Sequence, residues 1–171
     1  MGAGAVLAHP TDSKCPAHIP FQSNLRGRFC FGKPLTIEGR VLRGETQHPV
    51  SEALVEIWHP DQNGKFGRYA GKMRTDKNGF YRFQTILPGQ YYEKNYPHLG
   101  TVFFAVQAAG YPRQESKLYF NSQGQCFIDG THWAASPIGK RNELPYTQTA
   151  GSGEYVTHFL HRLSSQNSHT S

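Results

Sequence analysis

The fold is decided by the stretch Met73-Arg-Thr-Asp-Lys-Asn-Gly-Phe-Tyr-Arg-Phe-Gln-Thr-Ile-Leu-Pro-Gly-Gln-Tyr91. Its first part, Thr75 to Gly79, is rich in Asp, Asn and Gly, which favour turns. The next residues, from Phe80 to Ile86, alternate in side-chain character as a strand does, because successive side chains of a strand point to opposite faces. Leu87-Pro-Gly89 then ends the strand. The stretch therefore predicts one β-strand between two turns.

Further strands are expected in the runs 35–42, 53–59, 101–108, 117–120 and 154–163, of which 101–108 is the most apolar. In the run 53–59, the odd-numbered residues up to His59 fall on one face, and the even-numbered residues up to Trp58 fall on the other. No segment has a long helical period. Many short strands separated by turns predict an all-β fold, an antiparallel β-sandwich.

The length of 171 residues favours one domain. Residues 1–33 contain Pro10, Pro16 and Pro20 without a strand pattern, and we expect an extended N-terminal arm that packs on the body or on another subunit. The sandwich domain is expected to span residues 34–163, followed by a polar C-terminal tail at 164–171. The irregular stretch 121–154 is long for a loop, and such loops often serve a function.

Charge and composition exclude several classes of function. The net charge is +6, but Lys and Arg are scattered, so we expect no nucleic-acid partner. No apolar run approaches the roughly 18 residues of a membrane span, and residues 1–8 lack the pattern of a secretory signal, so a cytoplasmic protein without a membrane partner is expected. Cys15, Cys30 and Cys126 have no zinc-ligand spacing and indicate no disulfide framework.

Two stretches together resemble the intradiol ring-cleavage dioxygenases. The first spans Gly39 to Gly64 and ends with Ala53-Leu-Val-Glu-Ile-Trp-His-Pro-Asp-Gln-Asn-Gly64. The second is the stretch from Met73 to Tyr91 quoted above. Lys117-Leu-Tyr-Phe120 is similar to the next landmark of that family. The resemblance covers about residues 35–163 and implies the family's catalytic β-sandwich domain. That domain binds ferric iron through two Tyr and two His, and cleaves catechols between the hydroxyl-bearing carbons.

The resemblance also implies where the iron ligands would lie. The positions of the two Tyr ligands are occupied by Phe66 and Tyr91, and those of the two His ligands by Thr101 and Phe103. Phe has no donor atom, and a Thr hydroxyl is a poor ligand for a hard ferric ion. We therefore expect no iron cofactor and no ordinary ferric cleavage in this chain.

Other groups occupy positions near this vacated pocket. Where the family has an Arg before the His pair, this sequence has His98, and where a Gln is common it has Lys117. If the backbone follows the family, His98 and Lys117 converge with Tyr91, and we expect these three to be catalytic. The residues expected to contact the substrate are Trp58, Phe66, Tyr69, Thr101, Phe103 and Tyr119.

Three functional hypotheses follow. The first is an iron-independent enzyme that isomerises, cyclises or dehydrates an aromatic or polyketide-like small molecule by acid–base chemistry, as a homo-oligomer such as a dimer. The second is a non-catalytic binding module or partner subunit, in which His98 is a solvated loop residue and Lys117 a surface residue. The third is a ferric dioxygenase with a displaced ligand set made of Tyr69, Tyr91 and His98.

Overall fold

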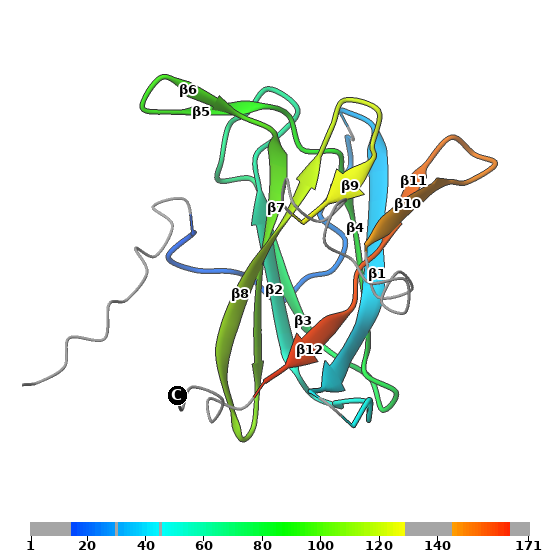
Figure 1. The fold of residues 1–171 in the computed structure, drawn as a ribbon. Helices are drawn as coiled ribbons and strands as arrows, with labels where there is room; N and C mark the ends of the chain where they lie inside the picture. The colour runs from blue at the N-terminus through cyan, green and yellow to red at the C-terminus, as the bar shows by residue number, and fades with distance from the viewer. Residues whose placement is uncertain (1–14, 30, 45, 129–144, 165–171) are drawn as a thin grey trace, which may run out of the picture.

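The computed structural model describes residues 15–29, 31–44, 46–128 and 145–164. Two five-stranded sheets face each other, and a short hairpin projects from one end (Figure 1). The first sheet contains β1 (Pro34–Arg43), β4 (Phe80–Ile86), β10 (Tyr146–Thr149), β11 (Tyr155–His158) and β12 (His161–Leu163). The second has the order β3 (Tyr69–Arg74), β2 (Leu54–His59), β7 (Gly100–Ala108), β8 (Tyr111–Phe120) and β9 (Cys126–Phe127). The hairpin consists of β5 (Tyr91–Glu93) and β6 (Tyr96–His98).

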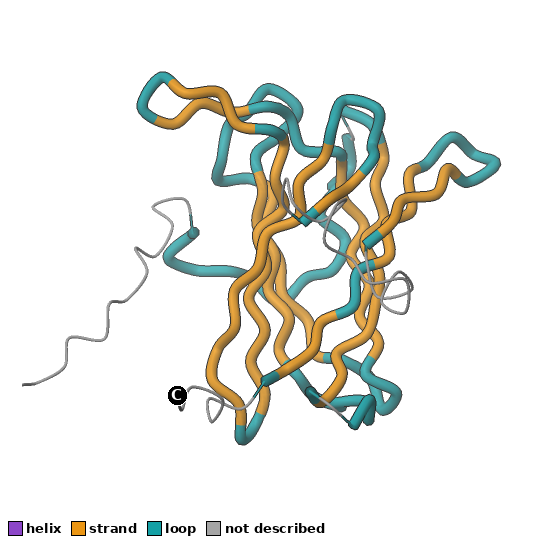
Figure 2. Tube along the Cα trace, in the orientation of Figure 1, coloured by secondary structure: helices purple, strands orange, loops and turns teal. Residues whose placement is uncertain are grey.

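This architecture confirms the predicted all-β sandwich. Among the described residues the structure contains strands and loops but no helix (Figure 2). The second sheet is antiparallel throughout, whereas β1 pairs in parallel with both β11 and β12. None of the described residues belongs to a helix that is long and apolar enough to span a bilayer.

The core lies between the two sheets and is built from alternate residues of each strand. The predicted division of the run 53–59 is confirmed, because Val55 and Ile57 are fully buried in this core while Trp58 belongs to a second cluster. On β7 the even-numbered residues, such as Phe104, enter the core, so the odd-numbered residues point to the outer face of the second sheet. That outer face carries the candidate site.

Residues 20–25 join the two sheets at their open edges. The Lys72 N–H donates to the Pro20 carbonyl at 3.0 Å, and the Gln84 N–H donates to the Ser23 carbonyl at 2.8 Å. The segment therefore pairs first with the edge of β3 and then with the edge of β4. A Cβ at Gly71 would lie 2.4 Å from the carbonyl oxygen of Gln22, so glycine permits this close approach. This part of the expected N-terminal arm packs on the body of its own chain.

Several strands differ from the sequence-based expectation. β3 and the β5–β6 hairpin were not predicted, and β8 begins at Tyr111 rather than at Lys117. The run 154–163 is divided into β11 and β12. The long stretch after Phe120 contains β9 and β10, while its residues 129–144 and most of the tail lie outside the described residues.

Candidate functional site

The outer face of the second sheet brings Trp58, Phe103 and Lys117 into one row across three strands. Phe103 on β7 is aligned with Trp58 on β2 and with Lys117 on β8. Since neighbours in an antiparallel sheet share a face, these side chains lie side by side. The Trp58 and Phe103 rings stack with centroids 5.8 Å apart and an interplanar angle of 8°.

Two loops place Phe66 and Tyr91 above this row. Gly64, at a positive φ of 83°, lets the turn before Phe66 pack against the chain before Tyr91, because a Cβ there would lie 2.4 Å from the Gln90 carbonyl oxygen. The Phe66 ring then meets Tyr91 edge-on at 5.2 Å between centroids. Phe103 lies 6.0 Å from Phe66 and 6.5 Å from Tyr91. We call the four rings of Trp58, Phe66, Tyr91 and Phe103 the aromatic cluster.

Two polar side chains border the aromatic cluster. His98 on β6 is aligned with Tyr91 on β5, and their rings stack with centroids 5.0 Å apart. The His98 side chain is 38% exposed, and its Nε2 lies 3.7 Å from Oε2 of Glu93. The Lys117 Nζ lies 5.3 Å from the centre of the Phe103 ring, within cation–π range. The structure thus brings the three predicted catalytic residues to the cluster, and their roles stay predictions.

The other expected substrate contacts are distributed differently. Thr101 shares the outer face with Phe103, but it is fully buried and its hydroxyl donates to the Leu99 carbonyl at 2.8 Å. Tyr119 lies on the outer face of β8 and stacks on Phe127 of β9, with centroids 5.9 Å apart. Tyr119 therefore extends the aromatic surface towards β9.

Tyr69 lies on the opposite side of the sheet from the aromatic cluster. The β2–β3 register aligns it with His59, whose side chain points into the core, so Tyr69 is buried there and stacks on His59 at 5.0 Å. The displaced iron-ligand set that includes Tyr69, Tyr91 and His98 is therefore not assembled. The sequence analysis did not predict β3, because Gly71 and the charged residues Lys72 and Arg74 interrupt the apolar pattern of a strand. The side of the sheet on which Tyr69 lies was therefore not predicted either.

His59 is held by hydrogen bonds within the core. Its Nδ1–H donates to the Pro60 carbonyl at 2.7 Å, which leaves Nε2 to accept from the Thr85 hydroxyl at 2.6 Å. Burial lowers the pKa of His59 to about 4, so the ring is neutral at pH 7. This arrangement fits a structural histidine.

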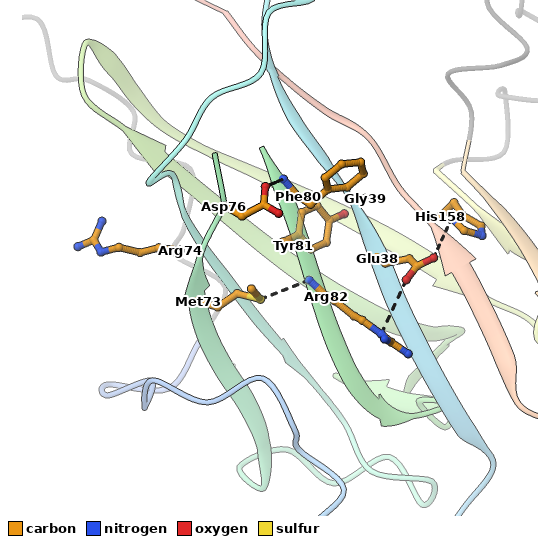
Figure 3. Close-up of a pocket in the computed structure, with 9 residues that line it drawn as sticks. All are labelled: Glu38, Gly39, Met73, Arg74, Asp76, Phe80, Tyr81, Arg82 and His158. Carbon is orange, nitrogen blue, oxygen red and sulfur yellow. Dashed lines mark hydrogen bonds and ion pairs between the residues drawn. The ribbon is translucent and has the colours of Figure 1, made fainter. Parts of the chain in front are cut away.

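A separate hollow of about 410 Å³ lies over β4, away from the aromatic cluster (Figure 3). Its charged groups are engaged with one another or with the main chain. Glu38 lies 3.8 Å from Arg82 and 3.5 Å from Nδ1 of His158, and the Asp76 carboxylate accepts from the main chain of its own turn. These side chains stabilise the surface of the first sheet.

Comparison with known proteins identifies the family. A family model described as "Dioxygenase" matches residues 23–129, and similar solved structures are intradiol ring-cleavage dioxygenases. This chain belongs to the intradiol dioxygenase family. Chlorocatechol 1,2-dioxygenase of Pseudomonas putida is 31% identical over 120 residues, which are 57% of this chain and 45% of that protein. The protocatechuate 3,4-dioxygenase beta chain of Burkholderia cepacia is 35% identical over 81 residues, which are 39% of this chain and 34% of that one.

Solved structures of the intradiol dioxygenase fold superpose on most of the chain. The dioxygenase domain of a carbohydrate-binding fusion protein from Streptomyces sp. SirexAA-E gives a TM-score of 0.71 at 21% identity, covering 91% of this chain and 95% of that one. The 3-chlorocatechol 1,2-dioxygenase of Rhodococcus opacus 1CP gives 0.68 at 21% identity, covering 86% and 68%. These likenesses show the fold. The chain spans less than half of the length of the curated relatives it matches.

The side chains at the family's iron position do not fit a ferric ion. Of the four positions that the resemblance assigns to ligands, Phe66 and Phe103 carry no donor atom, and the Thr101 hydroxyl is engaged with a main-chain carbonyl. The rings of Phe66, Tyr91 and Phe103 pack against one another at these positions. Among the described residues, no group of three or more His, Cys, Asp and Glu side chains is arranged to hold a metal.

Sequence reasoning missed two features of this site. One is the hairpin turn at Lys94 and Asn95, whose positive φ values of 48° and 68° set the register that stacks His98 on Tyr91 and brings Glu93 near. The two-residue spacing between Tyr-rich runs is a signal that predicts such a hairpin. The other is Ile19, which is 5% exposed and packs in the same cluster as Trp58. An isolated Ile in a Pro-rich arm gives no comparable signal.

Proposed function

We propose that this chain is an iron-independent enzyme that binds an oxygen-bearing aromatic or polyketide-like small molecule at the aromatic cluster and moves protons on it. One observation carries the proposal. Rings occupy the family's iron position, while His98 and Lys117 stand at the border of those rings. Aromatic rings with polar groups at their border suit a planar ligand with polar substituents.

His98 is suited to exchange a proton with the ligand. Its ring is oriented by stacking on Tyr91, and its Nε2 lies 3.7 Å from the Glu93 carboxylate. An imidazole can both accept and donate a proton, so it can serve as a general base or a general acid. Proton transfer of this kind supports isomerisation, cyclisation or dehydration.

Lys117 and Tyr91 would position the ligand. The Lys117 ammonium carries a fixed positive charge beside Phe103, which attracts a phenolate or carboxylate. The Tyr91 ring supplies an apolar wall that is 5% exposed. The net charge of +6 favours the approach of an anionic molecule.

Proton exchange on an enolisable aromatic ketone tests the proposal. With 2,4-dihydroxyacetophenone in deuterated buffer, the wild-type chain is expected to accelerate loss of the methyl proton signal in NMR spectra. His98→Ala should lower the rate by about a hundredfold, the usual contribution of a general acid or base. Lys117→Ala should weaken binding with less effect on the bound-state rate. Stoichiometric iron with a visible charge-transfer band and catechol cleavage would contradict the proposal.

A second candidate is a non-catalytic module or partner subunit. It is favoured by the burial of the cluster, since Trp58, Tyr91 and Phe103 are 2%, 5% and 3% exposed. A wild-type chain that leaves the ketone unchanged, and that forms a defined complex in light scattering or co-purification, would support this candidate. A self-sufficient homo-oligomer with exchange activity would support the enzyme.

A further inference from the structure

The indole N–H of Trp58 is buried without an acceptor. The side chain is 2% exposed, and Nε1 has no hydrogen-bond partner among the described residues. Its ring stacks on Phe103, and its neighbour on β3 is Ala70. Neither side chain offers an acceptor atom. Leaving a buried donor unpaired is unfavourable, so such a group calls for a partner outside the described residues.

The segment 15–19 packs over the aromatic cluster through its side chains. Ile19 is buried in the same packed cluster as Trp58, and Cys15 packs against it. The main-chain hydrogen bonds that anchor the segment to β3 involve Pro20 and Gln22. In Figure 1 this blue segment lies on the side of β2 and β7 that faces away from β1. Side-chain packing, and not strand pairing, thus brings Ile19 onto the cluster.

Two side chains at the cluster can only donate hydrogen bonds. Trp58 offers an N–H, and Lys117 offers an ammonium group. The carboxylate of Glu93 lies near His98. A ligand that satisfies this surface must bring acceptor atoms, and a carboxylate or phenolate oxygen on an aromatic ring meets this requirement.

We propose that Trp58 is the specificity-determining donor of this site. Its Nε1–H binds a carboxylate or phenolate oxygen of an aromatic ligand, which enters the space that the Ile19 side chain fills in the free protein. The inference rests on the proposed function, in which the aromatic cluster is the ligand site. Beyond the proposed function, it names the ligand oxygen that is recognised, the Trp58 Nε1–H that recognises it, and Ile19 as the side chain that the ligand displaces.

The indole proton itself reports this contact. The chain has two Trp residues, so Trp133→Phe leaves Trp58 as the source of the one indole N–H signal in a ¹⁵N-labelled protein. Benzoate is expected to move this signal downfield as the hydrogen bond forms, whereas toluene, which has a similar ring without oxygen, should not. A signal that responds equally to both, or to neither while benzoate binds, would overturn the assignment.

Affinities measured by saturation-transfer NMR complete the test. Trp58→Phe keeps a stacking ring and removes the donor, so it should weaken benzoate binding about tenfold and leave toluene unchanged. Ile19→Ala should tighten benzoate binding about threefold, because less apolar packing is displaced. Weaker binding in Ile19→Ala would show that Ile19 is a wall of the site and contradict the displacement.

The outcomes separate this inference from the proposed function. If benzoate binds the wild type and Trp58→Phe equally, the role of Trp58 is wrong and the proposed ligand site stands. If the wild type binds neither benzoate nor toluene at millimolar concentration, the ligand site and the inference are both wrong. Circular dichroism of Trp58→Phe serves as the control for folding, and the indole measurement does not depend on that variant.

Discussion

Two stacked pairs of a histidine and a tyrosine, in nearly the same geometry, lie on opposite sides of the second sheet, one on its core face and one in the β5–β6 hairpin beside its outer face. On the core face, the rings of His59 and Tyr69 lie 5.0 Å apart at 14°. In the β5–β6 hairpin, the ring centroids of His98 and Tyr91 lie 5.0 Å apart with an interplanar angle of 12°. The surroundings differ. His59 is buried and has both ring nitrogens hydrogen-bonded, whereas the His98 side chain is 38% exposed beside a carboxylate.

The comparison shows that environment, and not the residue pair, decides what a histidine can do. In the core, desolvation keeps His59 neutral, and its hydrogen bonds fix it as a structural element. At the outer face, solvent reaches His98, so a proton can enter and leave. The predictions below follow from this contrast, in order of decreasing effect.

The largest change is expected from restoring donor atoms on the outer face. The variant that combines Phe66→Tyr, Thr101→His and Phe103→His returns the ligand types that the family resemblance assigns to these positions. We expect it to bind about one iron per chain and to show a visible tyrosinate charge-transfer band, whereas the wild type should show neither. Elemental analysis and absorption spectra check this. Equal iron content in both proteins would contradict the proposed loss of the site.

Acidification should lower the stability of the protein through its buried histidines. Burial lowers the pKa of His59 to about 4 and that of His161 to about 3. In the unfolded chain these groups take up protons near pH 6.5, so the unfolded state binds more protons below that pH, and the free energy of unfolding falls as pH decreases. Between about pH 6.5 and its pKa in the folded state, each histidine should lower the free energy of unfolding by about 1.4 kcal/mol per pH unit.

Urea unfolding between pH 7 and pH 4 measures this slope. His161→Phe serves as the matched control, because it keeps an aromatic ring among Tyr81, Phe104 and Phe159 and removes one titrating group. The variant should lose part of the pH dependence. An unchanged slope would mean that His161 contributes no proton linkage.

The sequence predicted much of the fold because the core strands have clear alternation. The faces of β2 were correct down to His59 and Trp58, since a strand buried on one side encodes its orientation in every second residue. β3 was missed because Gly71 is required by the approach of residues 20–25, a contact from a distant part of the chain. Because β3 was not predicted, its register with β2 was unknown, and the side of the sheet on which Tyr69 lies could not be predicted.

The candidate site could be predicted only in part. The family resemblance brought Phe103, Tyr91 and Lys117 into one prediction, and the structure places them together. The stacking of His98 depends on a two-residue turn, and the cover by Ile19 depends on where the arm crosses the sheet. Strand periodicity shows neither, because the turn at Lys94 and Asn95 sets the hairpin register, and the cover by Ile19 comes from a distant arm that meets the sheet only after folding.

Removing the imidazole on each face should separate stability from activity. His59→Ala leaves a cavity and leaves the Thr85 hydroxyl and the Pro60 carbonyl without their partner, so it should lower the free energy of unfolding by about 3 kcal/mol. His98→Ala, at a partly exposed position, should change it by less than about 0.5 kcal/mol. Thermal and urea unfolding check the contrast. A similar loss in both variants would remove the distinction between the faces.

The smallest effect is expected from Lys117→Gln. An exposed cation–π contact contributes about 0.5 kcal/mol, so stability should change by no more than that. Benzoate binding should weaken, because the positive charge beside Phe103 is lost. Titrations at low and high salt measure this, and an affinity that does not change in either buffer would exclude Lys117 from ligand recognition. Lys72→Gln, next to Phe21, is a matched control for net charge.

Residues 20–25, which pair with the edges of β3 and β4, have a consequence for solubility. Its hydrogen bonds to Lys72 and Gln84 occupy main-chain groups at the two strand edges that the sheets would otherwise present to water. Exposed edges of this kind act as templates for strand recruitment between molecules. A chain shortened past Leu25 would therefore expose two unpaired strand edges, and we expect it to aggregate more readily than the full chain.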